Sequence, residues 1–257
     1  MLWVTALEER LGKHKVLTAP DQLGAFATDA SYFRITPKAI VNIETPDDVT
    51  NLLAICTQNN IGVTFRAAGT SLSGQAIGSG VLARVRGSYF QQCQVIDDGE
   101  LIELGPAVTG GQANRTLESY GRKIGPDPAT VNIANIGGII ANNSSGMCCG
   151  TTDNAYQTIR SAKLIFADGT SLDTSNFASR ESFAITHAAM LEGLSALRHT
   201  ILSDSRIEQR IRHKYRLKNT TGYGVNALLD FEDPIDQVLH LAVGSEGTLC
   251  FIESVVL

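Results

Sequence analysis

The sequence predicts an α+β chain of two lobes, a small lobe with parallel strands and a larger lobe of mixed, largely antiparallel strands. Two observations support this prediction. Near the N-terminus a strand, a capped helix and a second strand follow one another, which is the order of a parallel strand–helix–strand unit. Further along, strands come in pairs around Asp-Gly turns, as antiparallel hairpins do.

The first unit is read from residues 39–66. Residues 39–43, AIVNI, are apolar enough for a buried strand, and Thr45 followed by Pro46 marks the start of a helix. Residues 63–66, VTFR, form the next strand, parallel to the first through a right-handed crossover. The other expected elements are hairpins at 93–108 and 160–174, helices at 110–121 and 182–212, and a strand at 248–257. The expected domains are a helical lead-in (1–35), a first lobe (36–90) and a second lobe (91–257).

The composition and charge of the chain exclude several classes of function. The chain has 257 residues, of which 43% are hydrophobic, and this is enough to bury a core. Its net charge of −5 argues against nucleic acid as a partner. No apolar run has the length of a membrane span, and the five cysteines include no C-x-x-C pair for a metal site. We therefore expect a cytoplasmic protein without a metal.

One loop is unusual in its content of small residues. In TFRAAGTSLSGQAIGSGV, residues 64–81, the apolar strand ends at Arg66 and small residues follow, at the edge where α/β sheets bind ligands. A P-loop is excluded because Gln75 and Ala76 replace its lysine and hydroxyl. GSGVLA, residues 78–83, follows a long loop, so it is a weak dinucleotide fingerprint. A main-chain nest around a diphosphate and a plain surface turn both remain open.

Two further stretches have the same character. They are IGPDPATVNIANIGGIIANNSSGMCCG, residues 124–150, and VGSEGTLCFI, residues 243–252. Three such loops around strands are difficult to explain as turns alone. Together they predict a large, flat, diphosphate-bearing ligand between the two lobes.

The motifs FRAAGTSLSGQA, GPDPAT…IGGIIANNSSG and GSEGTL, in this order over residues 36–257, resemble a known family. It is the FAD-binding domain of the vanillyl-alcohol oxidase (PCMH) type, in the branch of D-lactate and D-2-hydroxyacid dehydrogenases. GRKIGPDPA, NNSSGMCCGT and KYRLKNTTGYGVNAL are similar to long bacterial members with a C-terminal iron–sulfur part. The resemblance implies an enzyme that oxidises a D-2-hydroxyacid, such as D-lactate or D-2-hydroxyglutarate. A noncatalytic flavin- or nucleotide-binding module is the alternative.

The resemblance also implies which residues contact FAD. They are Arg66, Ala67, Ala68, Gly69, Thr70, Ser71, Leu72 and Gln75 in the first loop, Pro126, Asp127, Pro128, Gly137, Gly138, Asn142, Asn143, Ser144 and Gly146 in the second, and Glu246 and Gly247 in the third. Some members link FAD to a histidine where this chain has Thr70, so we expect noncovalent FAD. For Arg66, a phosphate contact and a surface position at the strand end are both open.

Residues 206–218, RIEQRIRHKYRLK, are basic. The members at helical spacing indicate a solvated face. For Arg216 and Lys218, that role and the binding of a substrate carboxylate or an acidic partner domain are all open. The five histidines match no catalytic motif of the family, so no base is predicted. The sequence ends within an expected strand. We therefore expect substrate and iron–sulfur domains in a longer protein, and an inactive portion here.

Overall fold

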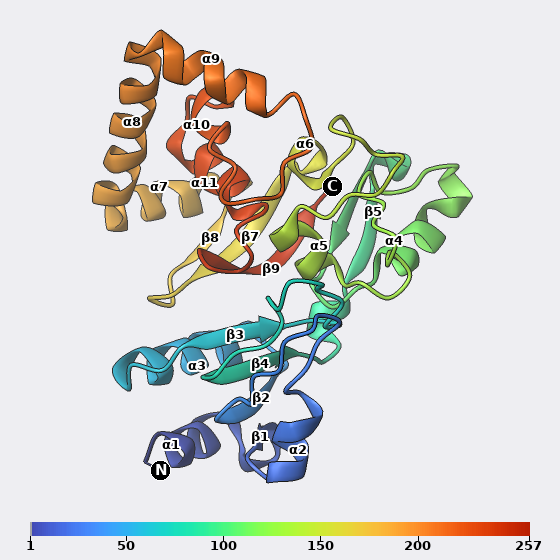
Figure 1. The fold of residues 1–257 in the computed structure, drawn as a ribbon, viewed down its shortest axis with the longest axis vertical. Coiled ribbons are helices and arrows are strands. Elements are labelled where there is room, and N and C mark those ends of the chain that lie inside the picture. Colours follow the sequence, from blue (N-terminus) through green and yellow to red (C-terminus); the bar gives the residue numbers. More distant parts are fainter. Residues whose placement is uncertain (1) are drawn as a thin grey trace.

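The computed structural model describes residues 2–257, which form two sheets (Figure 1). The first sheet has the strand order β1 (Val16–Leu17), β2 (Ala39–Ile43), β4 (Val81–Val85), β3 (Val63–Arg66). The second has the order β5 (Cys93–Ile96), β6 (Leu101–Leu104), β9 (Cys250–Val256), β7 (Ser161–Phe166), β8 (Ser171–Asp173). Each sheet with the helices packed on it is called a lobe below. The prediction of an α+β chain with two lobes is confirmed.

The first lobe is built on parallel strands. Both β2 and β3 are parallel to β4, which lies between them although it follows them in sequence. The helix between them, α3 (Pro46–Gln58), begins with the expected cap: Asp48 N donates to Thr45 Oγ1, and the Asp48 carboxylate accepts from Thr45 N. From the lead-in, α1 (Leu2–Leu11) packs on α3, α2 (Pro20–Ala25) follows, and β1 pairs with β2 in antiparallel sense.

The second lobe is antiparallel throughout. The two expected hairpins are β5–β6 and β7–β8. Strand β9 lies between them, paired with β6 on one side and β7 on the other. The short helices α4 (Gly110–Leu117), α5 (Ile136–Asn142) and α6 (Ala155–Thr158) connect the hairpins.

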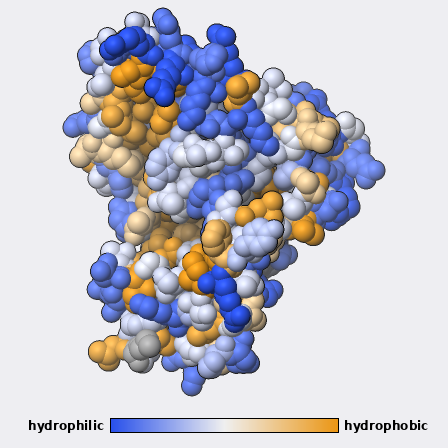
Figure 2. All heavy atoms as spheres, viewed as in Figure 1, coloured by the Kyte–Doolittle hydropathy of each residue, from blue (hydrophilic) through white to orange (hydrophobic). Residues whose placement is uncertain are grey.

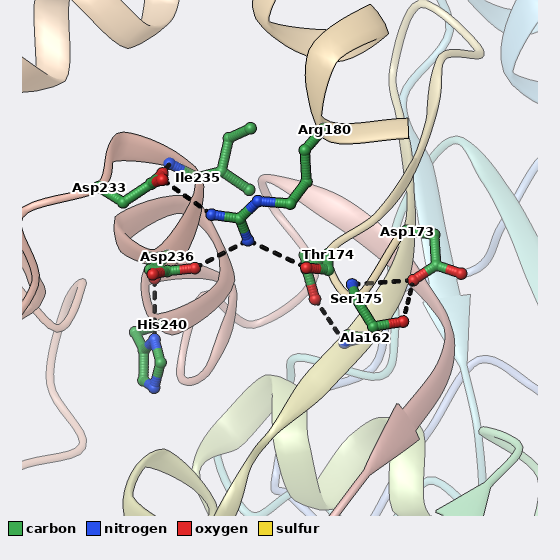
Figure 3. A network of polar contacts seen from close by, with 9 residues as sticks. All are labelled: Ala162, Asp173, Thr174, Ser175, Arg180, Asp233, Ile235, Asp236 and His240. Atoms are coloured by element: carbon green, nitrogen blue, oxygen red, sulfur yellow. Dashed lines mark hydrogen bonds and ion pairs between the residues drawn. The ribbon is translucent and has the colours of Figure 1, made fainter. Parts of the chain in front are cut away.

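A layer of helices covers the outer part of the second lobe. It contains α7 (Phe177–Thr186), α8 (Ala188–Ser203), α9 (Ser205–Lys214), α10 (Ala227–Asp230) and α11 (Pro234–Ala242). Within this layer, Arg180 of α7 forms ion pairs of 2.9 Å with Asp233 and Asp236 at the start of α11 (Figure 3). It also donates a hydrogen bond to the carbonyl of Thr174, which follows β8. On the face shown in Figure 2, hydrophobic residues gather over part of these helices and at the junction between the two lobes.

Aromatic rings join the two lobes. Phe251 of β9 lies in the hydrophobic core of the first lobe, with its ring centroid 4.8 Å from Phe65 and 5.6 Å from Phe90. Ile165 of β7 reaches the same core. The second sheet therefore contributes side chains to the core of the first lobe, and the lobes meet over a packed apolar contact.

The structure differs from the sequence reading in several helices. Residues 136–142, which we read as part of a loop, form helix α5, and α11 was not anticipated. The expected helix at 182–212 is three helices, with breaks at His187 and Asp204. Among residues 2–257 no helix has the length and hydropathy needed to cross a membrane.

Candidate functional site

A cavity of about 650 Å³ lies where the lobes meet, lined by all three small-residue stretches. This volume falls within the roughly 300–1,000 Å³ of typical ligand sites. The structure places these predicted residues in its lining: Ala67, Ala68, Gly69, Thr70, Ser71, Leu72, Gln75, Pro128, Gly137, Gly138, Asn142, Ser144, Lys218, Glu246 and Gly247. The predicted residues outside the lining are Arg66, Pro126, Asp127, Asn143, Gly146 and Arg216.

The first wall is the loop after β3, and it presents free hydrogen-bond donors. The main-chain N–H groups of residues 68–72 donate to no acceptor among residues 2–257. The neighbouring donors are used, since Ser73 N and Gln75 N donate to Ser71 Oγ and Ala76 N donates to Asp29. Consecutive unpaired N–H groups in a loop suit an anion such as a diphosphate.

Arg66 holds this loop from behind. Its Nη1 donates to the carbonyl oxygens of Thr28 (2.9 Å) and Ala76 (3.2 Å), and burial lowers its pKa while Asp29 opposes that shift. Gly69 fits against the same guanidinium, because a Cβ there would lie 2.5 Å from Arg66 Nη2. The φ of Gly69 is +74°, which also favours glycine. The side chain of Arg66 therefore braces the loop; its predicted phosphate contact stays a prediction.

The second wall is α5, which lies beside the first loop (Figure 1). A Cβ on Gly138 would lie 3.9 Å from the Ala67 side chain, so the walls approach closely there. The third stretch caps α5 at its C-terminal end: Gly244 N donates to Ile140 O, and Glu246 N donates to Ala141 O at 2.7 Å. The helix missed from the sequence is thus completed by residues about a hundred positions later.

A carboxylate–amide pair stands at this end of the cavity. Asn142 Nδ2 donates to Glu246 Oε1 at 2.6 Å, and Ser144 Oγ donates to Asn142 Oδ1 at 2.7 Å. Burial raises the pKa of Glu246, while the Asn142 hydrogen bond lowers it. Glu246 also has a φ of +56°, in the left-handed region that side chains rarely adopt. Residues that we assigned to the site from the second and third stretches therefore form one network.

Asp127 organises the loop that follows α5. Its carboxylate accepts from the N–H groups of Gly146 (2.8 Å), Cys148 (3.0 Å) and Cys149 (3.3 Å). The Cys149 thiol, and then these N–H groups, hold the pKa of Asp127 well below its usual range against the effect of burial. A Cβ on Gly146 would lie 2.0 Å from the Asp127 carbonyl. Asp127 and Gly146 thus shape the wall without lining the cavity.

Of the remaining predicted residues, some lie at the cavity and others face away from it. The Asn143 side chain accepts from Tyr156 N and faces α6, whereas Arg216 is exposed outside the cavity. Lys218 lies at the cavity, where its Nζ donates to Ser145 O at 2.7 Å, and Thr220 lines the cavity beside it. The structure therefore distinguishes two basic residues that the sequence left equivalent.

The apolar floor of the cavity escaped the sequence reading. It includes Phe65, Val85, Ile139, Phe251 and Ile252. The sequence signal was present, because Phe65 and Val85 lie at the C-terminal ends of parallel strands and Phe251 is the second residue of the strand after GSEGTL. These side chains read equally well as core, so only the structure shows that they also face a cavity.

These features fit FAD. A diphosphate needs several donors without a competing acceptor, which residues 68–72 supply, and a flat ring system needs an apolar surface, which the floor supplies. The sequence profile of the FAD binding domain matches residues 37–175. The chain belongs to this family of FAD-binding domains. FAD is the cofactor of the family, and the first two stretches of the cavity wall fall within the matched residues.

Curated relatives of the domain are longer proteins, and the domain covers a part of each. It is 26% identical over 249 residues to the D-2-hydroxyglutarate dehydrogenase of Haemophilus influenzae, covering 89% of this chain and 23% of that protein. It is 27% identical over 147 residues to the glycolate oxidase subunit GlcD of Escherichia coli K12, covering 56% of this chain and 29% of that one. The chain spans about a quarter of the length of the curated relatives it matches.

Solved structures agree on the fold. An alkyldihydroxyacetonephosphate synthase superposes with a TM-score of 0.64 at 14% identity, covering 99% of this chain and 40% of that one. A p-cresol methylhydroxylase superposes with a TM-score of 0.56 at 18% identity, covering 67% and 35%. The predicted vanillyl-alcohol oxidase (PCMH) type of FAD-binding fold is confirmed.

Proposed function

We propose that the domain is the FAD-binding part of an oxidoreductase that converts a D-2-hydroxyacid, such as D-lactate or D-2-hydroxyglutarate, to the 2-oxoacid. The observation that carries the proposal is the cavity between the lobes, with free main-chain donors on one wall and an apolar floor. Relatives named as a D-2-hydroxyglutarate dehydrogenase and a glycolate oxidase subunit support the substrate class.

The residues of the cavity take separate roles in this proposal. Bound FAD supplies a hydride acceptor. The N–H groups of residues 68–72 hold its diphosphate, and Asn142 with Glu246 closes the opposite wall. The proposed FAD is noncovalent, because Thr70 cannot form the histidyl link.

Lys218 is our candidate for holding the substrate carboxylate. Among residues 2–257 it is the one lysine, arginine or histidine in the cavity lining. Among residues 2–257 its ammonium makes one hydrogen bond, to Ser145 O, which leaves two N–H donors for an anion. With no histidine in the lining, the proton acceptor for the substrate hydroxyl is proposed to come from another part of a longer protein, and this chain alone to be inactive.

The test compares the purified chain with the longer gene product. The expected result is FAD that acid releases from both proteins, and flavin bleaching by D-2-hydroxyacids under anaerobic conditions in the longer protein alone. Recovery of FMN, or flavin that stays with the precipitated protein, contradicts the cofactor assignment. A longer protein that binds FAD but is bleached by no D- or L-2-hydroxyacid indicates the noncatalytic module instead.

The Lys218 assignment has a matched control. Lys218→Met in the longer protein is expected to raise KM for the hydroxyacid about tenfold or more while kcat changes less, since a charge-assisted hydrogen bond contributes roughly 1.5–3 kcal/mol. Arg210→Met, an exposed cation of α9 outside the cavity lining, is expected to change neither. Equal KM values for both variants would remove Lys218 from the site.

A further inference from the structure

A polar row crosses the first sheet near the C-terminal ends of its parallel strands. Asn42 of β2 pairs in register with Arg84 of β4, and Arg84 pairs in register with Arg66 of β3. Residues in register on neighbouring parallel strands project to the same face. Arg86, two positions after Arg84 and just beyond the end of β4, lies close enough for its charge to act on Arg84. Phe65 and Val85 alternate with these residues and face the cofactor cavity, so the row lies on the other face of the sheet.

Arg84 of this row is held in place without a counter-charge. The guanidinium of Arg84 stacks over the Phe26 ring at 4.1 Å, and that of Arg66 lies 5.4 Å from the same ring. Arg84 is half-buried, yet among residues 2–257 neither it nor Arg86 makes an ion pair or a side-chain hydrogen bond. Burial, and then the charges of Arg86 and Arg66, lower the pKa of Arg84.

A second side chain of the row is also unsatisfied. Asn42 Oδ1 is buried and has no hydrogen-bond partner among residues 2–257. A half-buried guanidinium such as that of Arg84, next to a buried amide oxygen, both without partners, is uncommon, because each unpaired buried polar group costs roughly 1–3 kcal/mol. The oxygen and nitrogen of an Asn amide are assigned from their hydrogen bonds, and here the oxygen has none. Rotating the amide by half a turn places the NH₂ of Asn42 where the oxygen now lies. Arg84, Arg86 and the Asn42 NH₂ then all supply donors, and the Asn42 oxygen takes the former place of the NH₂.

We propose that Asn42, Arg84 and Arg86 form a binding site for an oxyanion, either a carboxylate or a phosphate group, separate from the cofactor cavity. A guanidinium matches both groups with two parallel hydrogen bonds, and Phe26 fixes the plane of the Arg84 fork in advance. The neighbouring Arg66 is already occupied, since its Nη1 donates to main-chain carbonyls and Asp29 faces it. We therefore expect Arg84 to make the main contact with the anion and Arg86 to make a weaker one.

The test uses the flavin-loaded protein at constant ionic strength, with thermal unfolding followed in increasing inorganic phosphate or, separately, acetate. A ligand that binds only the folded protein raises Tm with its concentration. We expect a saturable rise in Tm for wild type with at least one of the two anions, and the stronger response identifies the chemical source. Arg84→Gln is expected to abolish the rise and Arg86→Gln to weaken apparent affinity about fivefold. Arg210→Gln, on exposed α9, should respond like wild type.

Two measurements keep the result interpretable. Flavin content is measured for every variant, because an anion that acts by displacing or replacing FAD would bind in the cavity and contradict a separate site. Arg84→Lys keeps the charge and loses the fork, so it should bind more weakly than wild type even if Arg84→Gln folds poorly. No saturable response in wild type, or the same response in Arg84→Lys and Arg84→Gln as in wild type, overturns the proposal.

Discussion

The two walls of the cavity between the lobes are alike in composition and opposite in hydrogen bonding. In the first loop, residues 68–72 leave their N–H groups free while the Arg66 side chain supports the loop from behind. In the second wall, the N–H groups after α5 are taken by Asp127, and the last carbonyls of α5 are taken by residues 244 and 246. Small residues thus expose the backbone in one place and permit close packing in the other.

The largest effect is expected at Gly69, on the first wall. In Gly69→Ala the new Cβ meets the Arg66 guanidinium and takes a φ of +74°, so we expect the loop to move and FAD affinity to fall by about two orders of magnitude or more. The new side chain points toward Arg66, behind the loop, so the effect would be steric. Equilibrium flavin titration of the apoprotein measures it.

Gly121→Ala is the control for the cost of placing an alanine in the left-handed backbone conformation. Gly121 has a φ of +65° with no atom within 4 Å of an added Cβ, so only the cost of about 1 kcal/mol for the left-handed backbone should appear. If both variants lose FAD equally, the first loop is not the diphosphate site.

On the second wall, Asp127→Asn should weaken the fold more than it weakens cofactor binding. One amide oxygen cannot replace a carboxylate that serves three N–H groups, and we expect the free energy of unfolding to fall by about 2–3 kcal/mol. FAD affinity should change less than in Gly69→Ala. Urea unfolding of the apoprotein checks the first expectation, and flavin titration checks the second.

The same residue gives a pH test. The pKa of Asp127 is lowered in the folded protein, so its contribution is complete above about pH 4 and is lost as the pH falls below its unfolded value. The stability difference between wild type and Asp127→Asn should therefore narrow in acid. A difference independent of pH between neutral and strongly acidic solution would show that the carboxylate charge is not involved.

A smaller effect is expected when Arg66→Lys removes the brace. A lysine ammonium cannot reach the carbonyls of Thr28 and Ala76 with the geometry of a guanidinium, so stability should fall by about 1–2 kcal/mol and FAD affinity about tenfold. Arg84→Lys, on the same Phe26 ring but without those hydrogen bonds, is the matched control and should keep normal FAD affinity. Equal losses in the two variants would contradict a specific brace.

Glu246→Gln should have the smallest effect, and it should be slightly stabilising at neutral pH. Burial raises the pKa of Glu246, so the charged side chain favours the unfolded state, and wild type loses stability as the pH rises above the usual glutamate range. The glutamine keeps an acceptor for Asn142 and has no charge to bury. Unfolding curves of the apoproteins should coincide in acid and diverge by less than about 1 kcal/mol at pH 7.

The sequence predicts local features well and distant partners poorly. The cap of α3, the two hairpins and the small-residue loops depend on residues within a few positions of one another, and the structure has them where expected. Helix α5 was missed because Gly137 and Gly138 have low helix propensity, and its ends are satisfied by carbonyls and N–H groups far along the chain. Tertiary contacts override propensity at that position.

The roles of single site residues show the same limit. The spacing of the motifs was enough to bring Asn142 and Glu246 to one cavity, although they are 104 positions apart. It could not show that Arg66 turns to carbonyls near residue 28, because nothing in FATDASYFRI indicates that this segment lies under the loop. Nor could it separate Lys218 from Arg216, since their difference arises from the path of the chain after α9.

The position of β9 has a consequence for how the chain reaches this fold during synthesis. Strand β9 is the last of the nine described strands to leave the ribosome, yet it sits in the middle of the second sheet, between β6 and β7. Until it arrives, two hairpins have open edges and the core of the first lobe lacks Phe251. Such long-range closure is slow, and unpaired edges attract other chains. Expression at lower temperature or with chaperones should therefore raise the soluble yield, mainly by protecting the nascent chain while β9 is awaited.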